Sequence, residues 1–192
     1  IQNAKAHIDS MKLRSDQIII QSLPVEHSFG IVCYLWTCLT LKCSIDFSSV
    51  FLSKKGLLKK EMKNAVIHLS PAQVQFILKE KSSEIIKGVD TISVGGGISG
   101  QSNIRELLDS FDNTKAYVSY GLTEAGPRVL TGKLNLKLDQ NYIGQAIGNV
   151  KIKVFSDEVL KEEGVGRLSV LSPSLKLNTQ TDEMVDNYLL TR

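Results

Sequence analysis

Residues 120–126 read Tyr-Gly-Leu-Thr-Glu-Ala-Gly and bring together side chains that could bind a nucleoside triphosphate. The ring of Tyr120 offers a surface on which a base can stack. The Thr123 hydroxyl can donate a hydrogen bond to a phosphate oxygen, and the Glu124 carboxylate is a hard oxygen ligand of the kind that Mg²⁺ prefers. Gly121 adds backbone freedom between the ring and these groups. Each residue alone would be a weak signal, but a plain turn does not require the combination, which therefore predicts a nucleotide-binding loop.

A glycine-rich stretch at residues 95–100, Gly-Gly-Gly-Ile-Ser-Gly, is a second candidate site. It fits the G-x-G-x-x-G pattern between a predicted strand and a predicted helix, where the backbone can approach a nucleotide closely and the helix N-terminus attracts a phosphate. The pattern alone leaves open a nicotinamide dinucleotide site, as in an oxidoreductase, and a turn whose glycines serve packing only. The dinucleotide fingerprint usually opens its fold, whereas this stretch follows the fourth predicted strand.

His27 is a third candidate, within the stretch Leu-Pro-Val-Glu-His-Ser-Phe-Gly at residues 23–30. A lone histidine is more often structural or exposed than functional. His27 gains weight because it follows the first predicted strand at its carboxyl end, where ligands of parallel sheets bind. His7 and His68 do not follow a predicted strand at its carboxyl end, and we assign them a background role.

These three stretches lie in loops of a repeating strand and helix pattern. The strands are expected at 17–22, 44–51, 65–69, 89–94 and 116–120, and the helices at 28–41, 54–64, 70–81 and 102–112. Ser70-Pro71 is typical of a helix start, with serine as the N-cap and proline in the first turn. Crossovers of this length predict an α/β fold over residues 1–126, with a mostly parallel sheet flanked by helices.

Residues 127–192 are expected to form a linker followed by a small β-rich module. Residues 127–142 carry no strong period. Strands are predicted at 150–155, 167–171 and 188–191, with a turn marked by Gly164 and Gly166. The short connections between these strands indicate a small sheet or a distorted barrel.

Composition and charge fit a soluble globular protein. Of the 192 residues, 42% are hydrophobic and 22% are charged, which argues against disorder. A net charge of +3 without a basic stripe predicts no nucleic-acid partner. No apolar run reaches the roughly 18 residues of a membrane span, and no signal peptide opens the sequence. Because the three cysteines do not suggest a disulfide framework, we predict a cytoplasmic location.

Taken in order, the motifs Pro-x-x-His-x-x-Gly at 24–30, Gly-Gly-Gly at 95–97 and Tyr-Gly-Leu-Thr-Glu-x-Gly at 120–126 resemble those of the adenylate-forming superfamily. That superfamily includes acyl-CoA synthetases, adenylation domains of nonribosomal peptide synthetases and luciferases. Residues 143–155, 164–168 and 187–191 are similar to three further family motifs. The chain departs from the family at Arg167 (usually Glu), at Arg192 (usually Gly) and at residues 97–98, where Gly-Ile replaces Ala-Pro.

The resemblance implies a role for each matching residue. Tyr120 would stack on the adenine of ATP or AMP with Gly121 beside it, Thr123 would contact the α-phosphate, and Glu124 would bind Mg²⁺. His27 would form part of the wall of the acyl pocket. The glycines that would line the adenine and acyl pocket through their backbone are Gly95, Gly96 and Gly97. The residues that could shape the acyl pocket are Phe29, Cys33, Trp36, Ile98 and Ser119.

The resemblance also implies a two-step reaction, in which a small carboxylic acid reacts with ATP to give an acyl-adenylate. A thiol then accepts the acyl group, either from CoA or from the phosphopantetheine of a carrier protein. We expect the chain to be the central fragment of the family's large N-terminal domain, without the upstream phosphate loop and the C-terminal domain that carries the catalytic lysine, and inactive by itself. The alternative is a degenerate adenylation fold that acts as a binding module or scaffold without catalysis.

Overall fold

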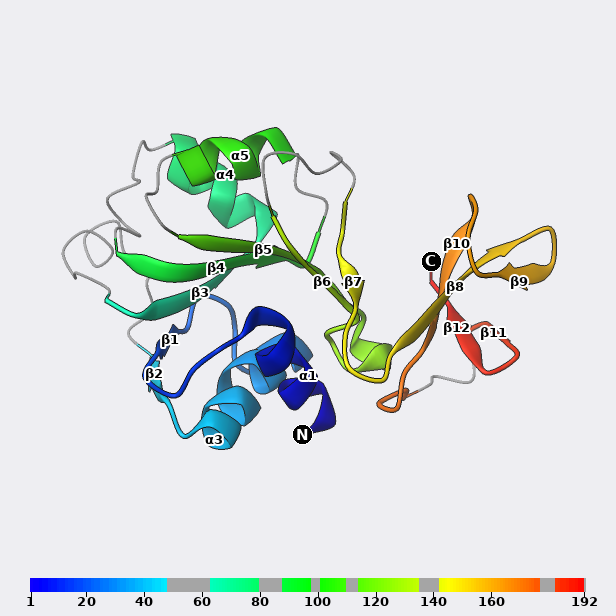
Figure 1. The fold of residues 1–192 in the computed structure, drawn as a ribbon, viewed down its shortest axis with the longest axis horizontal. Helices are drawn as coiled ribbons and strands as arrows, with labels where there is room; N and C mark the ends of the chain where they lie inside the picture. The colour runs from blue at the N-terminus through cyan, green and yellow to red at the C-terminus, as the bar shows by residue number, and fades with distance from the viewer. Residues whose placement is uncertain are drawn as a thin grey trace.

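The computed structural model describes residues 1–47, 63–79, 88–97, 101–109, 114–134, 142–176 and 182–191. The chain forms two sheets, a larger one flanked by helices and a smaller one at the C-terminal end (Figure 1). This arrangement confirms the predicted α/β architecture followed by a β-rich module. The predicted helix at 54–64 lies almost wholly outside the described residues.

The larger sheet has seven strands in the order β2-β1-β3-β4-β5-β6-β7. They are β1 (Ile18–Ile20), β2 (Ser44–Asp46), β3 (Ala65–Leu69), β4 (Val89–Gly95), β5 (Lys115–Tyr120), β6 (Leu130–Lys133) and β7 (Gln145–Ala146). The first five strands are parallel, as predicted, whereas β6 runs antiparallel to β5 and β7 antiparallel to β6. The sequence predicted no strand between 127 and 142, so the position of β6 in this sheet is a correction.

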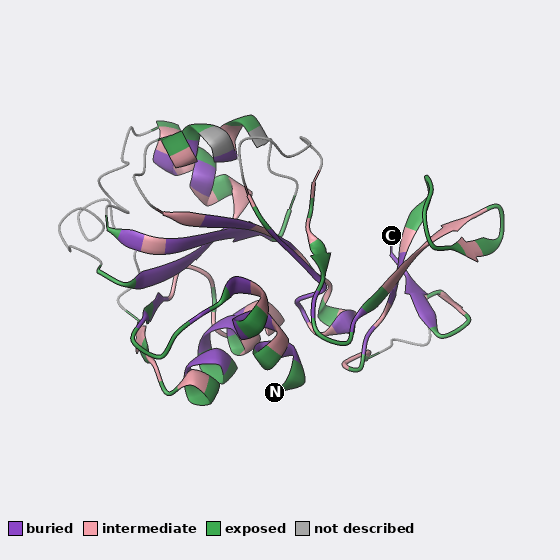
Figure 2. Cartoon of the chain, in the orientation of Figure 1, coloured by how far each residue is buried: buried purple, intermediate pink, exposed green. Residues whose placement is uncertain are grey.

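Helices cover both faces of the larger sheet (Figure 1). Helices α4 (Pro71–Lys79) and α5 (Gln101–Asp109) lie on one face, and α1 (Gln2–Met11) lies on the other with a helix that follows β1. Strand β3 is buried along its whole length, so its side chains enter both layers (Figure 2). Ile67 packs in the layer under α4 and α5, and Val66 packs in the layer under α1. This two-sided burial explains why β3 is apolar at every position except His68.

The helix predicted at 28–41 is present as one continuous run with a π-helical middle. It consists of α2 (Ser28–Gly30), η1 (Ile31–Trp36) and α3 (Thr37–Leu41). The Thr37 hydroxyl donates to the Val32 carbonyl at 2.9 Å, within the widened part. Single π-type turns inside helices are frequent at functional sites, and this one lies directly after the His27 loop.

Helix α4 begins as the sequence predicted. The Gln73 amide donates to the Ser70 hydroxyl at 3.3 Å, and the Gln73 side chain accepts from the Ser70 amide at 2.8 Å, which completes a capping box. The Gln73 side chain also donates to the Ser22 carbonyl at 2.7 Å. The start of α4 is thereby tied to the loop after β1.

Helix α1 was not predicted from the sequence. Its buried face consists of Asn3, Ala4, His7, Ile8 and Met11. Two of these five residues are polar, so the helix shows no clear apolar period along the sequence. The spacing of the buried positions is nevertheless helical, and burial of polar residues indicates that they have partners inside the fold.

The smaller sheet is antiparallel and has the order β11-β12-β10-β8-β9. Its strands are β8 (Lys151–Ser156), β9 (Val159–Lys161), β10 (Arg167–Leu171), β11 (Met184–Val185) and β12 (Tyr188–Leu190). The three longer predicted strands are confirmed, and the short strands β9 and β11 were not predicted. Within the described residues, no helix has the length and apolar character needed to cross a membrane.

Candidate active site

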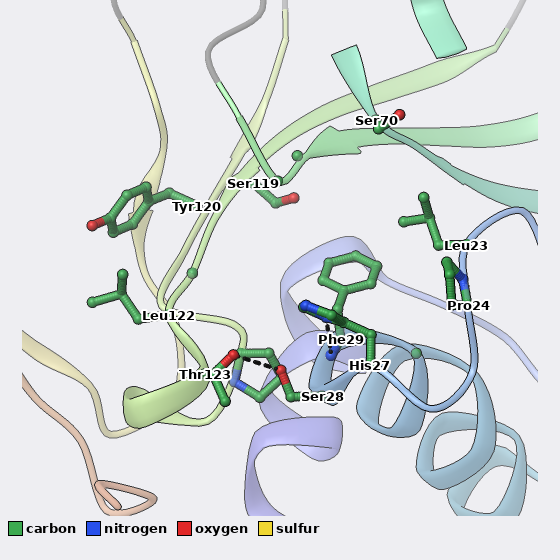
Figure 3. A pocket seen from close by; sticks show the side chains of 15 residues that line it. Leu23, Pro24, His27, Ser28, Phe29, Ser70, Ser119, Tyr120, Leu122 and Thr123 are labelled. Atoms are coloured by element: carbon green, nitrogen blue, oxygen red, sulfur yellow. Dashed lines mark hydrogen bonds between the residues drawn. The ribbon is translucent and has the colours of Figure 1, made fainter. Parts of the chain in front are cut away.

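A cavity of about 240 Å³ lies at the carboxyl ends of β1, β4 and β5 (Figure 3). The three loops singled out in the sequence all contribute to it. The lining residues are Leu23, Pro24, His27, Ser28, Phe29, Gly30, Ser70, Gly95, Gly96, Ser119, Tyr120, Gly121, Leu122, Thr123 and Pro127. The parallel topology explains this convergence, because loops that follow neighbouring parallel strands meet at one edge of the sheet.

A hydrogen bond between Ser28 and Thr123 joins two of the loops directly. Their hydroxyl oxygens are 3.0 Å apart although the residues are 95 positions apart in the chain (Figure 3). Thr123 is exposed and starts a 3₁₀ turn, η3 (Thr123–Ala125), so its hydroxyl is reachable from the cavity. No sequence pattern pointed to Ser28 apart from its place next to His27.

His27 is exposed and acts as the N-cap of α2. Its Nδ1 accepts a hydrogen bond from the Phe29 amide at 3.4 Å. The cap orients the imidazole at the edge of the cavity and leaves Nε2 outside this bond. His27 therefore lines the cavity and also caps the N-terminus of α2.

The glycines at the cavity allow close approach of backbone segments. A Cβ atom on Gly95 would overlap the Ser119 hydroxyl, and one on Gly121 would overlap the Pro127 carbonyl oxygen. Gly96 has a φ of 84° and nothing within 4 Å of the position of a Cβ, so its backbone faces open space. These glycines let a ligand lie against the main chain. Gly97 is exposed and does not line the cavity.

Tyr120 lines the cavity with part of its surface and packs its ring toward the smaller sheet. The ring contacts the cluster that contains Val129 and Val170. Burial raises the pKa of the Tyr120 hydroxyl, a hydrogen bond with Thr191 opposes this, and the nearby Glu124 carboxylate raises the pKa further. The Glu124 side chain is half-buried and lies close to the Tyr120 hydroxyl, just outside the set of lining residues.

The segment that follows β10 of the smaller sheet holds the loop at 120–126 from behind. The Ser172 hydroxyl donates to the Ala125 carbonyl at 2.8 Å, and the Lys176 amide donates to the Glu124 carbonyl at 2.7 Å. A Cβ atom on Gly126 would come within 2.5 Å of the Ser174 Cβ. The backbone that carries Thr123 and Glu124 is therefore fixed between the two sheets.

The described residues contain no group of three or more His, Cys, Asp or Glu side chains that could hold a metal ion. Glu124 could supply one carboxylate ligand to Mg²⁺. Protein sites for Mg²⁺ commonly use one or two carboxylates and take the remaining ligands from water and substrate phosphates. The donor set thus fits a magnesium ion that arrives with a nucleotide.

Behind the cavity lies a group of buried side chains that includes His68, for which the sequence indicated only a background role, and Arg128, for which it indicated none. Phe29 stands between the cavity and two buried basic residues, His68 and Arg128. The Asn3 side chain donates to the Arg128 carbonyl at 2.8 Å and accepts from the Arg128 amide at 3.1 Å. These two bonds hold the segment after the loop at 120–126 against helix α1.

The residues predicted to shape the acyl pocket are only partly brought together. Phe29 and Ser119 line the cavity. Cys33 is completely buried, and Trp36 is 39% exposed on the outside of its helix. Ile98 lies outside the described residues.

Comparison with protein families decides the assignment of the fold. A family model described as AMP-binding enzyme matches residues 1–176. The chain belongs to the AMP-binding enzyme family. The chain therefore has the fold of the adenylate-forming ligases. The motif at 120–126 lies inside the region that the AMP-binding family model matches. A search of curated protein sequences gives no match.

Solved structures with the same fold are longer than this chain. Apo MatB from Rhodopseudomonas palustris superposes with a TM-score of 0.81 at 18% identity, over 98% of this chain and 39% of MatB. O-succinylbenzoate coenzyme A synthetase (MenE) from Bacillus subtilis, in complex with ATP and magnesium ion, gives a TM-score of 0.78 at 17% identity, over 98% and 41%. VinN gives 0.75 at 16% identity, over 91% and 44%. At these identities the likeness shows the fold, and the chain spans less than half the length of each protein.

Proposed function

We propose that this chain is part of an ATP-dependent ligase that activates a carboxylic acid as an acyl-adenylate. The observation that carries the proposal is the convergence of three loops on one cavity, with the exposed Thr123 hydroxyl bonded to Ser28 at its edge. Membership of the AMP-binding family supports adenine nucleotide as the ligand. The MatB and MenE structures with bound ATP support it as well.

In this proposal the loop at 120–126 binds the nucleotide. Tyr120 and Gly121 contact the adenine from one side, and the backbone of Gly95 and Gly96 contacts it from the other, with Gly97 just outside the cavity lining. Thr123 donates its hydroxyl to the α-phosphate. Glu124 holds Mg²⁺, which would reduce the charge repulsion between the phosphates and the incoming carboxylate.

The first reaction is a nucleophilic attack on the α-phosphorus. A carboxylate oxygen of the acid forms a bond to that phosphorus, the bond from phosphorus to the bridging oxygen breaks, and pyrophosphate leaves. Hydrogen-bond donors aimed at the α-phosphate stabilise the negative charge that builds up there. In this proposal the Thr123 hydroxyl, which is exposed at the cavity, supplies one such donor.

The second reaction transfers the acyl group to a thiol. The sulfur of CoA, or of the phosphopantetheine on a carrier protein, attacks the acyl carbonyl carbon, and AMP leaves as its bond to that carbon breaks. His27, Phe29 and Ser119 form the wall on the acyl side of the cavity in this proposal. Leu23 and Pro24 make part of that wall apolar, which suits an acid with a hydrocarbon body.

A titration calorimetry series tests the nucleotide and magnesium roles. The chain is titrated with AMP, and with ATP in the presence and absence of Mg²⁺. We expect AMP to bind, and Mg²⁺ to raise the affinity for ATP by roughly tenfold, which corresponds to about 1.4 kcal/mol. Glu124→Ala should remove the effect of Mg²⁺ while the affinity for AMP changes less than about twofold.

Glu163→Ala is the matched control, because Glu163 is an exposed carboxylate in the turn before β10, in the smaller sheet. This variant should retain the full effect of Mg²⁺ on ATP affinity. Absence of AMP binding by the unmodified chain would overturn the proposal in favour of a scaffold. An undiminished Mg²⁺ effect in Glu124→Ala would remove the metal role of Glu124.

A further inference from the structure

Three basic side chains are enclosed together behind the cavity. His7 from α1, His68 from β3 and Arg128 from the segment after η3 are each 0% exposed. The ring centroids of the two histidines are 5.2 Å apart. Basic side chains are almost never fully buried without a partner, so this group requires an explanation.

Most of the polar atoms in this group have no hydrogen-bond partner among the described residues. The Arg128 Nη2 donates to the Thr131 hydroxyl at 2.7 Å, but Nε and Nη1 have no acceptor. Both ring nitrogens of His7 and of His68 are also without a partner. Together these are six buried nitrogens with no hydrogen-bond partner, in a group that contains a permanently charged guanidinium.

The described part of the chain supplies no carboxylate to balance Arg128. The acidic group that acts on the pKa of Arg128 is the Cys33 thiol, and burial raises the pKa of that thiol to about 12. Burial, and then the charge of Arg128, lowers the pKa of both histidines, so they are neutral at pH 7. The group therefore carries one positive charge and offers donor nitrogens to an anion.

Phe29 connects this group to the cavity through contacts on both sides. Its ring lines the cavity (Figure 3). It also meets the His68 ring edge-on at 5.4 Å and lies 5.6 Å from the Arg128 guanidinium carbon. Cation–π contact with Phe29 is a weak substitute for an ionic partner, so an anion that reached this place would be the preferred neighbour of Arg128.

We propose that His7, His68 and Arg128 form an anion subsite at the inner end of the cavity, which receives a second carboxylate of the acid substrate when Phe29 turns aside. The substrate class is then a dicarboxylic acid, with one carboxylate directed to the α-phosphate and the other to Arg128. Only the identification of the anion as a carboxylate of the substrate rests on the proposed function. The subsite itself rests on the buried, unpaired nitrogens.

The test compares two acids that differ only in the second carboxylate. The chain is titrated at pH 7 and constant ionic strength with hexanedioate and with hexanoate, and NMR follows the Nε–H of Arg128 and the ring resonances of His7 and His68. We expect hexanedioate to bind at least tenfold more tightly and to shift the Arg128 and His68 resonances in a saturable way. Equal affinity for the two acids, or no shift of the Arg128 resonance, would overturn the proposal.

Two arginine variants and a second anion serve as controls for this test. Arg128→Met should reduce the preference for hexanedioate to less than twofold, and Arg167→Met, which removes a surface arginine paired with Glu183, should leave it unchanged. A preference that persists in Arg128→Met would contradict the assignment. If Arg128→Met does not fold, the comparison of acids in the unmodified chain still decides. Sodium sulfate that produces the same shifts as hexanedioate would indicate a site for any anion and overturn the assignment to a substrate.

The same samples separate this inference from the proposed function. AMP binding is measured beside the two acids. Binding of AMP together with equal affinity for the two acids overturns the dicarboxylate subsite alone. Absence of AMP binding together with a hexanedioate preference overturns the adenylating role and leaves the subsite in place.

Discussion

Two buried histidines make the stability of this chain depend on pH. Burial, and to a smaller extent the charge of Arg128, lowers the pKa of His68 to about 3. The pKa of His7 is lowered for the same reasons. In the unfolded chain a histidine has a pKa near 6.5, so below that pH the unfolded state binds protons that the folded state does not. Stability is then fully present above about pH 6.5 and is lost as the pH falls toward the folded-state pKa.

Denaturant unfolding at pH 7, 6 and 5 measures this effect. The loss should approach about 1.4 kcal/mol per pH unit for each histidine, and His68→Gln should reduce the slope. His27→Gln is the matched control, because His27 is exposed and lies at the edge of the cavity. A slope that is the same in His68→Gln and in the unmodified chain would show that His68 is protonated in the folded state.

At this residue scale the sequence predicted one part of the site and missed another. Thr123, His27 and Gly95 could be named because each follows a predicted strand, and topology brings such loops together. His68 and Arg128 could not be identified, because their partners lie far away in the chain, at positions 7 and 29. A histidine inside an apolar strand has no local pattern that separates a background role from a buried cluster.

At the scale of elements, the turn from β5 into η3 depends on a glycine. A Cβ atom on Gly121 would overlap the Pro127 carbonyl oxygen, which belongs to the backbone and cannot move as a side chain can. Gly121→Ala should therefore destabilise the fold by at least about 2 kcal/mol. Gly97→Ala is the control, because its Cβ would lie 3.4 Å from Pro71 in ordinary contact, and it should change stability by less than about 0.5 kcal/mol. Thermal unfolding of both variants checks the difference, and equal stabilities would refute the close approach.

Elements with a regular apolar pattern were predicted well, and elements without one were missed. Strand β3 is buried on both faces and is apolar at every position except His68. Strand β4 is buried at nearly every position, and Val89, Ile92 and Val94 are its apolar side chains. Helix α1 was missed because Asn3 and His7 occupy its buried face. Strand β6 was missed because it follows a loop and has only four residues, Leu130–Lys133, including a glycine. In both cases contacts with distant elements, and not a local period, decide the structure.

At the scale of the whole molecule, the two sheets are joined at the loop that carries Thr123 and Glu124. Val129 and Leu130 beside the larger sheet pack against Val150 and Val170 from the smaller one. Polar contacts from the smaller sheet reach the backbone of Glu124 and Ala125. A change at this junction should therefore alter nucleotide affinity without touching any residue that lines the cavity.

Ser172 and Ser169 offer a matched pair for testing this coupling. Both are buried in or next to β10, but the Ser172 hydroxyl donates to the Ala125 carbonyl at 2.8 Å, whereas the Ser169 hydroxyl has no partner in the described part of the chain. Ser172→Ala leaves a buried carbonyl without its donor and should cost about 1–2 kcal/mol in unfolding free energy. Ser169→Ala should cost less than about 0.5 kcal/mol, because it removes a group that gains nothing from the fold.

The decisive measurement is the affinity for AMP in the two serine variants under conditions where both remain folded. If the smaller sheet positions the nucleotide loop, Ser172→Ala weakens AMP binding severalfold while Ser169→Ala leaves it unchanged. Equal AMP affinity in the two variants, together with the expected difference in stability, would mean that the junction holds the sheets together without positioning Thr123 and Glu124. The pair therefore separates a structural role of the smaller sheet from a role in ligand binding, since both substitutions remove the same atom from the same buried region.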